Sequence, residues 1–270
     1  MTRRTSIGLG STIAVLVAVV VWVVIAQGQR GGTQQPPPQR QRVEVTHVKP
    51  DMLQAYQDLI KSELIPNLKK AGIAYRWTWA NGPSGDSFTF VNEQPIANYA
   101  QYDQPGALQR VIGADGAAKF QAKLRPMIVS QHIYVQTLRQ DLSILSASGQ
   151  AAPFIAVQIF QVAPGKGNEF TSLMTSDYLP NYKKAALKDF RVYAMNFGAP
   201  GGQIVTVRGI AKYAELDEPG LLNKAGLSQE QVQQLNQRRA PIASVIENEL
   251  ARFVPEMSFG SMAPPHAATN

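Results

Sequence analysis

The sequence of 270 residues contains no cysteine and only three histidines. Without cysteine the chain has no disulfides, thiol chemistry or cysteine-ligated metal, so packing alone must hold the fold. The histidines, His47, His132 and His266, are not spaced as ligands on one element, and we expect no metal site. A packed or solvated role explains His47 better than a catalytic one.

Catalytic and nucleotide-binding motifs are also missing. The sequence has no Gly-x-Ser-x-Gly elbow, and Gly165 and Gly167 lack the further glycine of a dinucleotide-binding loop. Acidic residues are absent from the first 42 positions, which hold five arginines. Without those five, the formal net charge falls from +7 to about +2, so we expect no nucleic-acid partner.

An apolar stretch at residues 7–26 follows two arginines and is long enough to span a bilayer as an N-terminal hydrophobic helix. It predicts a signal anchor or a cleaved signal peptide over residues 1–26. Residues 27–42, rich in Pro, Gln and Gly, predict a linker. We therefore expect a cell-envelope protein with a periplasmic or extracellular domain, attached to the membrane if the segment is not cleaved.

A repeated segment organises the rest of the chain. Residues 62–71 read SELIPNLKKA, and residues 176–185 read SDYLPNYKKA, 114 positions later. A second pair, YAQYDQPGAL at 99–108 and YAELDEPGLL at 213–222, has the same offset. The chain is therefore predicted to contain two tandem copies of one unit.

Strand-like alternation and helical periodicity predict the same element order in both copies. The first copy is predicted to contain a strand at 43–48, a helix at 52–71, strands at 74–80 and 87–91, a helix at 117–138 and a closing strand at 141–145. The second is predicted to contain a strand at 154–162, a helix at 168–186, strands at 190–197 and 204–210, a helix at 229–253 and a closing strand at 256–259.

This β-α-β-β-α-β order is ferredoxin-like and predicts an α+β protein with both helices of each unit on one sheet face. The two sheets can pack together or join their edges into a barrel, with the helices outside. Matched prolines, Pro66 with Pro180 and Pro126 with Pro241, predict helix kinks or breaks. The predicted segments are repeat 1 at 43–145, a linker at 146–153, repeat 2 at 154–260 and a tail at 261–270.

The segment from Pro164-Gly-Lys-Gly167 through Phe170 to Leu179-Pro-Asn-Tyr-Lys-Lys184 resembles NIPSNAP and antibiotic-biosynthesis-monooxygenase-like members of the dimeric α/β-barrel superfamily. The first copy resembles the same pattern, so the resemblance covers residues 43–260. It implies an intramolecular pseudo-dimer. It leaves the activity open, because the superfamily includes cofactor-free oxygenases, haem-handling enzymes and proteins of no assigned activity.

Differences between the copies indicate where a ligand could bind. Tyr75, Trp77 and Trp79 alternate along one strand, and the residues matched to them in the second copy are smaller. This difference predicts space for a flat apolar ligand between the repeats. An aromatic core stripe is the competing interpretation. Arg76 and Arg191 are matched on the opposite face, as a carboxylate or phosphate site or as ion-pair partners. The candidate ligand-binding residues are Tyr75, Arg76, Trp77, Trp79, His47, Arg191 and Tyr193.

Three functions follow from these patterns. The first is an exported or membrane-tethered protein that binds a small, partly apolar ligand between its repeats and needs no cofactor. The second is a cofactor-independent or haem-dependent monooxygenase, with His47 or Arg76 as its polar group and His47 or His132 as a haem ligand. The third is a protein-interaction module that uses the outer helices.

Overall fold

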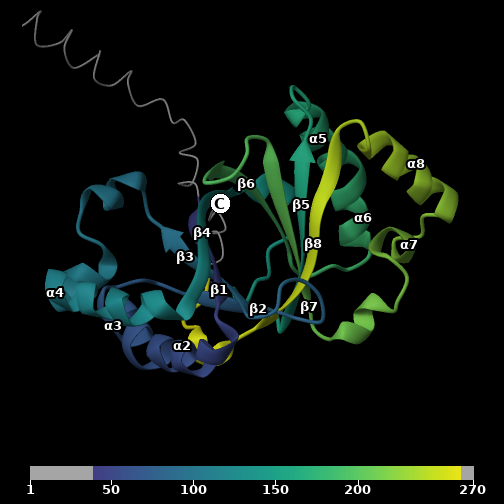
Figure 1. Ribbon diagram of the computed structural model, residues 1–270. Helices are drawn as coiled ribbons and strands as arrows, with labels where there is room; N and C mark the ends of the chain where they lie inside the picture. The colour runs from purple at the N-terminus through teal and green to yellow at the C-terminus, as the bar shows by residue number, and fades with distance from the viewer. Residues whose placement is uncertain (1–38, 263–270) are drawn as a thin grey trace, which may run out of the picture. The chain divides into compact units, whose positions relative to one another are not determined.

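The computed structural model of the protein describes residues 39–262 (Figure 1). The predicted membrane segment at 1–26, the linker as far as residue 38 and the tail from residue 263 lie outside this part. No helix within residues 39–262 is long and apolar enough to cross a membrane. We call residues 39–145 the first half and residues 146–262 the second half.

The helices and strands follow a similar order in the two halves. The first half contains β1 (Arg40–Val48), η1 (Pro50–Met52), α2 (Leu53–Leu59), η2 (Ile60–Leu64), α3 (Ile65–Lys70), β2 (Trp77–Asn81), β3 (Thr89–Ile96), η3 (Tyr99–Asp103), α4 (Ala107–Leu124), η4 (Arg125–Met127), β4 (Ile128–Leu138) and η5 (Gln140–Leu142). The second half contains β5 (Phe154–Val162), α5 (Gly167–Leu173), η6 (Met174–Tyr178), α6 (Leu179–Lys184), β6 (Phe190–Phe197), β7 (Gln203–Ile210), η7 (Tyr213–Leu216), α7 (Leu221–Lys224), α8 (Gln229–Arg239), β8 (Ala243–Phe253) and η8 (Pro255–Met257).

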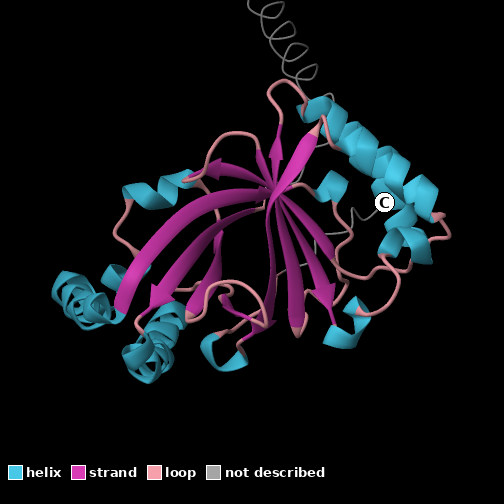
Figure 2. Cartoon of the chain, turned by 45° about the vertical axis from the view of Figure 1, so that its right-hand side comes forward, coloured by secondary structure: helices cyan, strands magenta, loops and turns pink. Residues whose placement is uncertain are grey.

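The strands close into one barrel in the order β1, β3, β2, β8, β5, β7, β6, β4, and neighbouring strands are antiparallel. The halves join edge to edge, where β2 pairs with β8 and β4 pairs with β6. The helices lie on the outer sides of the strands (Figure 2). Of the two arrangements that the sequence left open, edge joining is the one observed, and the predicted α+β class is confirmed.

Some barrel strands are covered on both faces, whereas β4 and β8 are exposed over much of their length. In β5, Ile155 and Val157 belong to a cluster inside the barrel, whereas Phe160 and Val162 belong to a cluster beneath the second-half helices. A strand covered on both faces reads as a nearly continuous apolar run. A third cluster, which includes Tyr56, lies between the wall and the first-half helices.

The second helix of each half ends earlier than predicted. Residues 128–138 and 243–253, expected to be helical, form β4 and β8. In each case a proline, Pro126 or Pro241, ends the helical pattern, because proline removes a helix hydrogen bond and clashes with the preceding turn. These prolines mark the change from helix to strand and not a kink within a helix.

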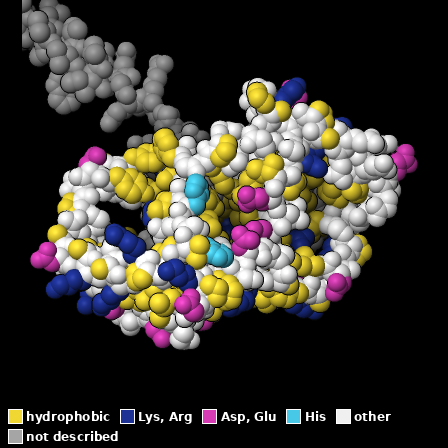
Figure 3. Space-filling view, in the orientation of Figure 1, with side chains coloured by type: hydrophobic (Ala, Val, Ile, Leu, Met, Phe, Trp, Pro, Cys, Tyr) yellow, Lys and Arg dark blue, Asp and Glu magenta, His cyan; other side chains and the backbone are white. Residues whose placement is uncertain are grey.

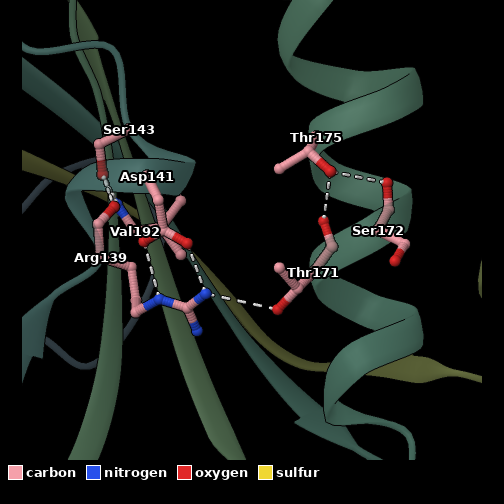
Figure 4. Close-up of polar contacts among 7 residues, drawn as sticks. All are labelled: Arg139, Asp141, Ser143, Thr171, Ser172, Thr175 and Val192. Atoms are coloured by element: carbon pink, nitrogen blue, oxygen red, sulfur yellow. Dashed lines mark hydrogen bonds and ion pairs between the residues drawn. The ribbon is translucent and has the colours of Figure 1, made fainter.

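A turn replaces the predicted closing strand of the first half. Asp141 lies in η5, where it forms a bidentate ion pair with Arg139 at 2.9 and 2.6 Å (Figure 4). The Ser143 hydroxyl accepts a hydrogen bond from the backbone N–H of Val192 at 3.0 Å. Beyond the turn, Ile144 forms one isolated bridge with Phe190, and the second predicted closing strand similarly leaves one bridge at Phe259. The strand prediction is therefore wrong because local side-chain bonds stabilise a turn.

The repeated Pro-Asn motif lies just after a π-helical turn in the first helix of each half. The turns are η2, before Pro66, and η6, before Pro180. The neighbouring asparagine side chain donates to a carbonyl of the turn, from Asn67 to Glu63 at 2.8 Å and from Asn181 at 2.6 Å to the equivalent carbonyl. The predicted irregularity at these two prolines is thus a widened turn that accommodates the missing N–H.

Candidate ligand cavities

The strand register corrects the predicted match between the two halves. Trp77 pairs with Glu93, and Arg191 pairs with Val207. Since Glu93 and Val207 are 114 positions apart, Trp77 corresponds to Arg191, and Arg76 corresponds to Phe190. The sequence comparison was one residue out of register at this strand, and a slip of one residue moves every side chain to the other face. Arg76 and Arg191 therefore do not form a matched pair.

Five of the predicted site residues, Tyr75, Trp77, Trp79, Arg191 and Tyr193, lie together inside the barrel. The rings of Tyr75 and Trp77 have centroids 5.4 Å apart, and those of Trp77 and Trp79 are 6.3 Å apart. The guanidinium of Arg191 lies 5.4 Å from the Trp77 ring. Trp79 is fully buried. Aromatic rings fill this part of the barrel, as in the core-stripe interpretation.

A polar network runs between these rings. The Gln41 amide donates to the Tyr75 hydroxyl at 3.0 Å and to the Tyr193 hydroxyl at 3.4 Å. Glu93 lies in the same region, and burial raises the pKa of its carboxyl, although the Arg191 charge opposes this. Asp189 forms an ion pair with Arg191 at 3.3 Å. These groups make the barrel interior a packed core with buried charge, and none of the cavities described below is lined by Tyr75, Trp77 or Trp79.

The two described histidines lie away from these cavities. His47 contacts the Thr89 hydroxyl at 3.0 Å, and His132 contacts the Gly198 carbonyl at 2.6 Å. Neither lines a cavity, and His266 lies outside the described residues. A haem bound in one of these cavities would have no histidine ligand from residues 39–262. The predicted histidine-ligated haem therefore does not fit these cavities.

The first cavity, which we call the aromatic cavity, lies between the second-half strands and helices α5, α6, α7 and α8. Its volume is about 310 Å³. It is lined by Gln158, Phe160, Phe170, Leu173, Met174, Tyr178, Tyr182, Phe190, Thr206, Arg208, Gly220, Leu221, Leu222, Asn223, Val232, Asn236, Arg239 and Val245. A neighbouring space of about 450 Å³ shares Tyr182, Phe190 and Arg208, so the two form one region over β5 and β7.

The polar groups of the aromatic cavity are cationic or neutral. No Asp or Glu belongs to its own lining, although Glu249 lines the neighbouring space, and within residues 39–262 neither Arg208 nor Arg239 forms an ion pair. The buried Tyr178 hydroxyl has no hydrogen-bond partner in this part of the chain. Burial raises the pKa of Tyr178, with Arg239 opposing, so the phenol is neutral at pH 7. The site can therefore bind a planar apolar molecule and stabilise negative charge on it.

The second cavity, which we call the arginine cavity, lies between the first-half strands and helices α3 and α4. Its volume is about 610 Å³, and its charged lining residues are Arg42, Glu44, Arg76 and Arg110. Leu64, Leu68, Leu108, Phe120, Leu124 and Ile128 supply most of its apolar wall. Figure 3 shows the surface hollowed near α4, with basic side chains close to the opening.

The sequence comparison missed most residues of the aromatic cavity. The signal was present in the repeated segment itself, where Tyr178 and Tyr182 replace Leu64 and Leu68 at the offset of 114. Both tyrosines line the aromatic cavity, and both leucines line the arginine cavity. The two cavities therefore occupy equivalent places in the two halves.

The chain matches no family model, and no curated protein matches its sequence. Solved structures do match its fold. An anthrone oxidase-like protein aligns with a TM-score of 0.54 and 11% identity over 86% of this chain and 97% of its own. A predicted monooxygenase from Fusobacterium nucleatum subsp. nucleatum aligns with a TM-score of 0.51 and 11% identity over 81% and 93%.

A mutant chlorite dismutase from Candidatus Nitrospira defluvii, solved in complex with cyanide, aligns with a TM-score of 0.51 and 9% identity, over 81% of this chain and 92% of its own. At such low identity these likenesses show the fold alone. The chain thus shares the fold of these proteins, a closed barrel with outer helices, which agrees with the fold that the sequence resemblance implied.

Proposed function

We propose that the protein is a cofactor-independent, monooxygenase-like enzyme that binds an electron-rich, ring-hydroxylated aromatic molecule in the aromatic cavity. The observation that carries this proposal is a cavity lined by five aromatic rings and two arginines, with no carboxylate in its lining. The rings of Phe160, Phe170, Tyr178, Tyr182 and Phe190 suit a flat substrate. The fold is compatible with this reaction class, because two of the structural neighbours are described as a predicted monooxygenase and an anthrone oxidase-like protein.

The arginines give the cavity a chemical role beyond binding. A guanidinium a few ångströms from a phenol or enol favours its ionised form and lowers its pKa by about 1–3. Arg208 and Arg239 are placed to stabilise such an anion, and the neutral Tyr178 hydroxyl can donate a hydrogen bond to its oxygen. The lining of the aromatic cavity itself contains no Asp, Glu or His, and Glu249 is the one carboxylate that lines the neighbouring space, so the proton passes to Glu249 or to solvent.

The ionised substrate is the reductant for molecular oxygen. When a ring methylene becomes a carbonyl, one oxygen atom enters the product, and the other leaves as water with the two methylene hydrogens. The substrate supplies all four electrons, so the reaction needs no added reductant. The protein's part is to hold the ring, exclude bulk water and stabilise the anion.

We also propose that the chain arose by duplication of one ferredoxin-like unit, which the 114-residue offset between Glu93 and Val207 in the strand register supports. Export and membrane attachment remain predictions, since they rest on residues 1–38.

Alizarin binding tests the charge argument, because its hydroxyl groups change colour on ionisation. We expect the full chain to lower the apparent pKa of bound alizarin by about 1 or more. Arg208→Met should remove most of this decrease, and Tyr178→Phe should remove a smaller part. Arg238→Met is the matched control, because Arg238 neighbours Arg239 on α8 but lies outside the cavity and pairs with Asp177 on the surface.

Oxygen consumption tests the catalytic part separately. We expect the wild-type chain, mixed with anthrone under air, to consume oxygen faster than anthrone alone, and Arg208→Met to remove most of that increase. Alizarin binding without any increase in oxygen uptake from anthrone would leave a binding protein and overturn the oxygenase. Alizarin bound with an unchanged pKa would overturn the role of the arginines.

A further inference from the structure

Arg76 is a buried cation that forms no ion pair with any residue of the described part of the chain, 39–262. Only 1% of the residue is exposed, and its Nε and Nη2 atoms have no hydrogen-bond partner within residues 39–262. A backbone bridge to Phe259 fixes its place beside β2, and its side chain lines the arginine cavity. A buried charge left unpaired is strongly unfavourable, so a native protein retains one only where something compensates it.

The neighbouring charges do not compensate Arg76. Glu44, the one carboxylate of the cavity lining, is paired with Arg42 at 2.7 Å. Arg110 is exposed and donates to the Pro105 carbonyl at 2.8 Å. Burial lowers the pKa of Arg76, with Tyr56 and Glu44 opposing, yet an arginine stays protonated in proteins. The inner part of the cavity therefore carries one unmatched positive charge.

We propose that the arginine cavity binds a small carboxylic acid with an apolar tail, whose carboxylate pairs with Arg76. The Arg76 guanidinium is a planar fork of N–H donors, and the spacing of these donors matches the two oxygens of a carboxylate. One unmatched charge favours a monoanion over a phosphate dianion. The tail contacts Leu64, Leu68 and Phe120 on the helix side of the cavity. This site lies in the first half and does not depend on the function proposed for the aromatic cavity.

Calorimetric titration of the full chain with three probes tests the ligand class. Hexanoate supplies the carboxylate and the tail, hexanol supplies the tail alone, and inorganic phosphate supplies an anion without a tail. We expect wild-type protein to bind hexanoate about tenfold or more tightly than hexanol. Equal affinities for hexanoate and hexanol would overturn the proposal. They would mean that the Arg76 guanidinium gains nothing from the carboxylate and is hydrogen-bonded by water instead. Phosphate binding as tight as hexanoate binding would overturn the carboxylate class.

Two variants test whether Arg76 is the residue that binds the carboxylate. Arg76→Met should lose the preference for hexanoate, keep hexanol binding and raise the melting temperature, because it removes an unpaired buried charge. Arg76→Lys should keep part of the preference, since it keeps the charge and loses the bidentate edge. Arg238→Met, on the opposite half, is the control that should bind hexanoate like the wild type. Hexanoate binding that is unchanged in a folded Arg76→Met protein would overturn the proposal, and if that variant does not fold, the comparison of hexanoate with hexanol on the wild type still decides it.

Discussion

The aromatic cavity and the arginine cavity lie at equivalent places in the two halves, between the barrel wall and the outer helices. Equivalent positions of the two linings differ in character: Leu64 and Tyr178, Leu68 and Tyr182, Arg76 and Phe190, Glu44 and Gln158, and Gln94 and Arg208. In the second half Tyr182 packs against Phe190 with ring centroids 5.1 Å apart. In the first half leucines take the places of Tyr178 and Tyr182, and Arg76 takes the place of Phe190. Equivalent places in the fold thus hold aromatic rings in one half and a buried cation in the other.

The largest effect is expected when the second half is made like the first. Phe190→Arg removes a core ring that is 5% exposed and introduces a buried charge, so we expect a loss of about 3–5 kcal/mol in the free energy of unfolding. Urea denaturation measures the loss. Phe197→Arg is the matched control, since Phe197 lies on the same strand and is 62% exposed. A loss below about 1 kcal/mol in Phe190→Arg would mean that this cavity can accept a cation.

The barrel interior offers a second contrast between the halves, because Glu93 corresponds to Val207. Burial raises the pKa of Glu93 above that of the unfolded chain, so the folded state holds more protons in the interval between the two values. The free energy of unfolding contributed by this group therefore falls as the pH rises through that interval. Glu93→Gln should be more stable than wild type at pH 8, by about 1–3 kcal/mol, and the difference should shrink toward pH 4.

Thermal melts at several pH values measure this difference. Glu44→Gln provides the control, since Glu44 lies on the outer face and is paired with Arg42. If Glu93→Gln were less stable than wild type at pH 8, the attraction between Glu93 and Arg191 would outweigh the burial of the carboxylate.

The sequence predicted the order of the elements, the first helix of each half and most of the early strands. The hydrophobic periodicity of these segments is clear. Residues 154–162 and 190–197 form strands with the predicted bounds. The last strand of each half was missed for a physical reason. Ile242, Ile246 and Leu250 recur every four residues, a spacing that suits one face of a strand as well as one face of a helix. Only the proline at 241 distinguishes the two.

The candidate site was harder to predict, because it depends on register. A shift of one residue in matching β2 with β6 paired Arg76 with Arg191 and placed the aromatic residues opposite Phe190 and Val192. The structure places Phe190 and Val192 beneath the helices and Arg191 inside the barrel. A single sequence does not fix such a register, because both alignments leave apolar residues on a buried face. The tyrosines of the aromatic cavity can be matched to their first-half equivalents without the strand register, because they lie within the repeated motif.

Substitution of the prolines after the π-helical turns tests a feature that the two halves share. Pro66→Ala and Pro180→Ala should each lower the free energy of unfolding by about 0.4–1 kcal/mol, because proline restricts the unfolded chain and the turn accommodates it in the folded one. Denaturant unfolding of both variants measures this. Similar losses would support equivalent turns. A gain in stability for one variant would show that its turn is strained by the proline.

The smallest effect is expected at the turn after β4, where the halves differ again. In the first half Arg139 and Asp141 form an ion pair, whereas in the second half the buried Val254 leads into η8, where Glu256 is exposed and Met257 is buried. The hydrogen bonds from Arg139 lower the pKa of Asp141, so its contribution to stability is present above the unfolded pKa of about 3.9 and is lost as the pH falls through the lower folded value. Because the Asp141 side chain is 54% exposed, we expect Asp141→Asn to lose only about 0.5 kcal/mol at pH 7, and nothing near pH 2.

Thermal melts at these two pH values, with Glu256→Gln as the control in the equivalent turn, measure this loss. A loss that persists at low pH would show that Asp141 supports the turn through its shape and not through its charge. The Thr171 hydroxyl, 3.4 Å from Arg139 Nη2, then becomes the contact to remove next, because it links this first-half turn to helix α5 of the second half (Figure 4).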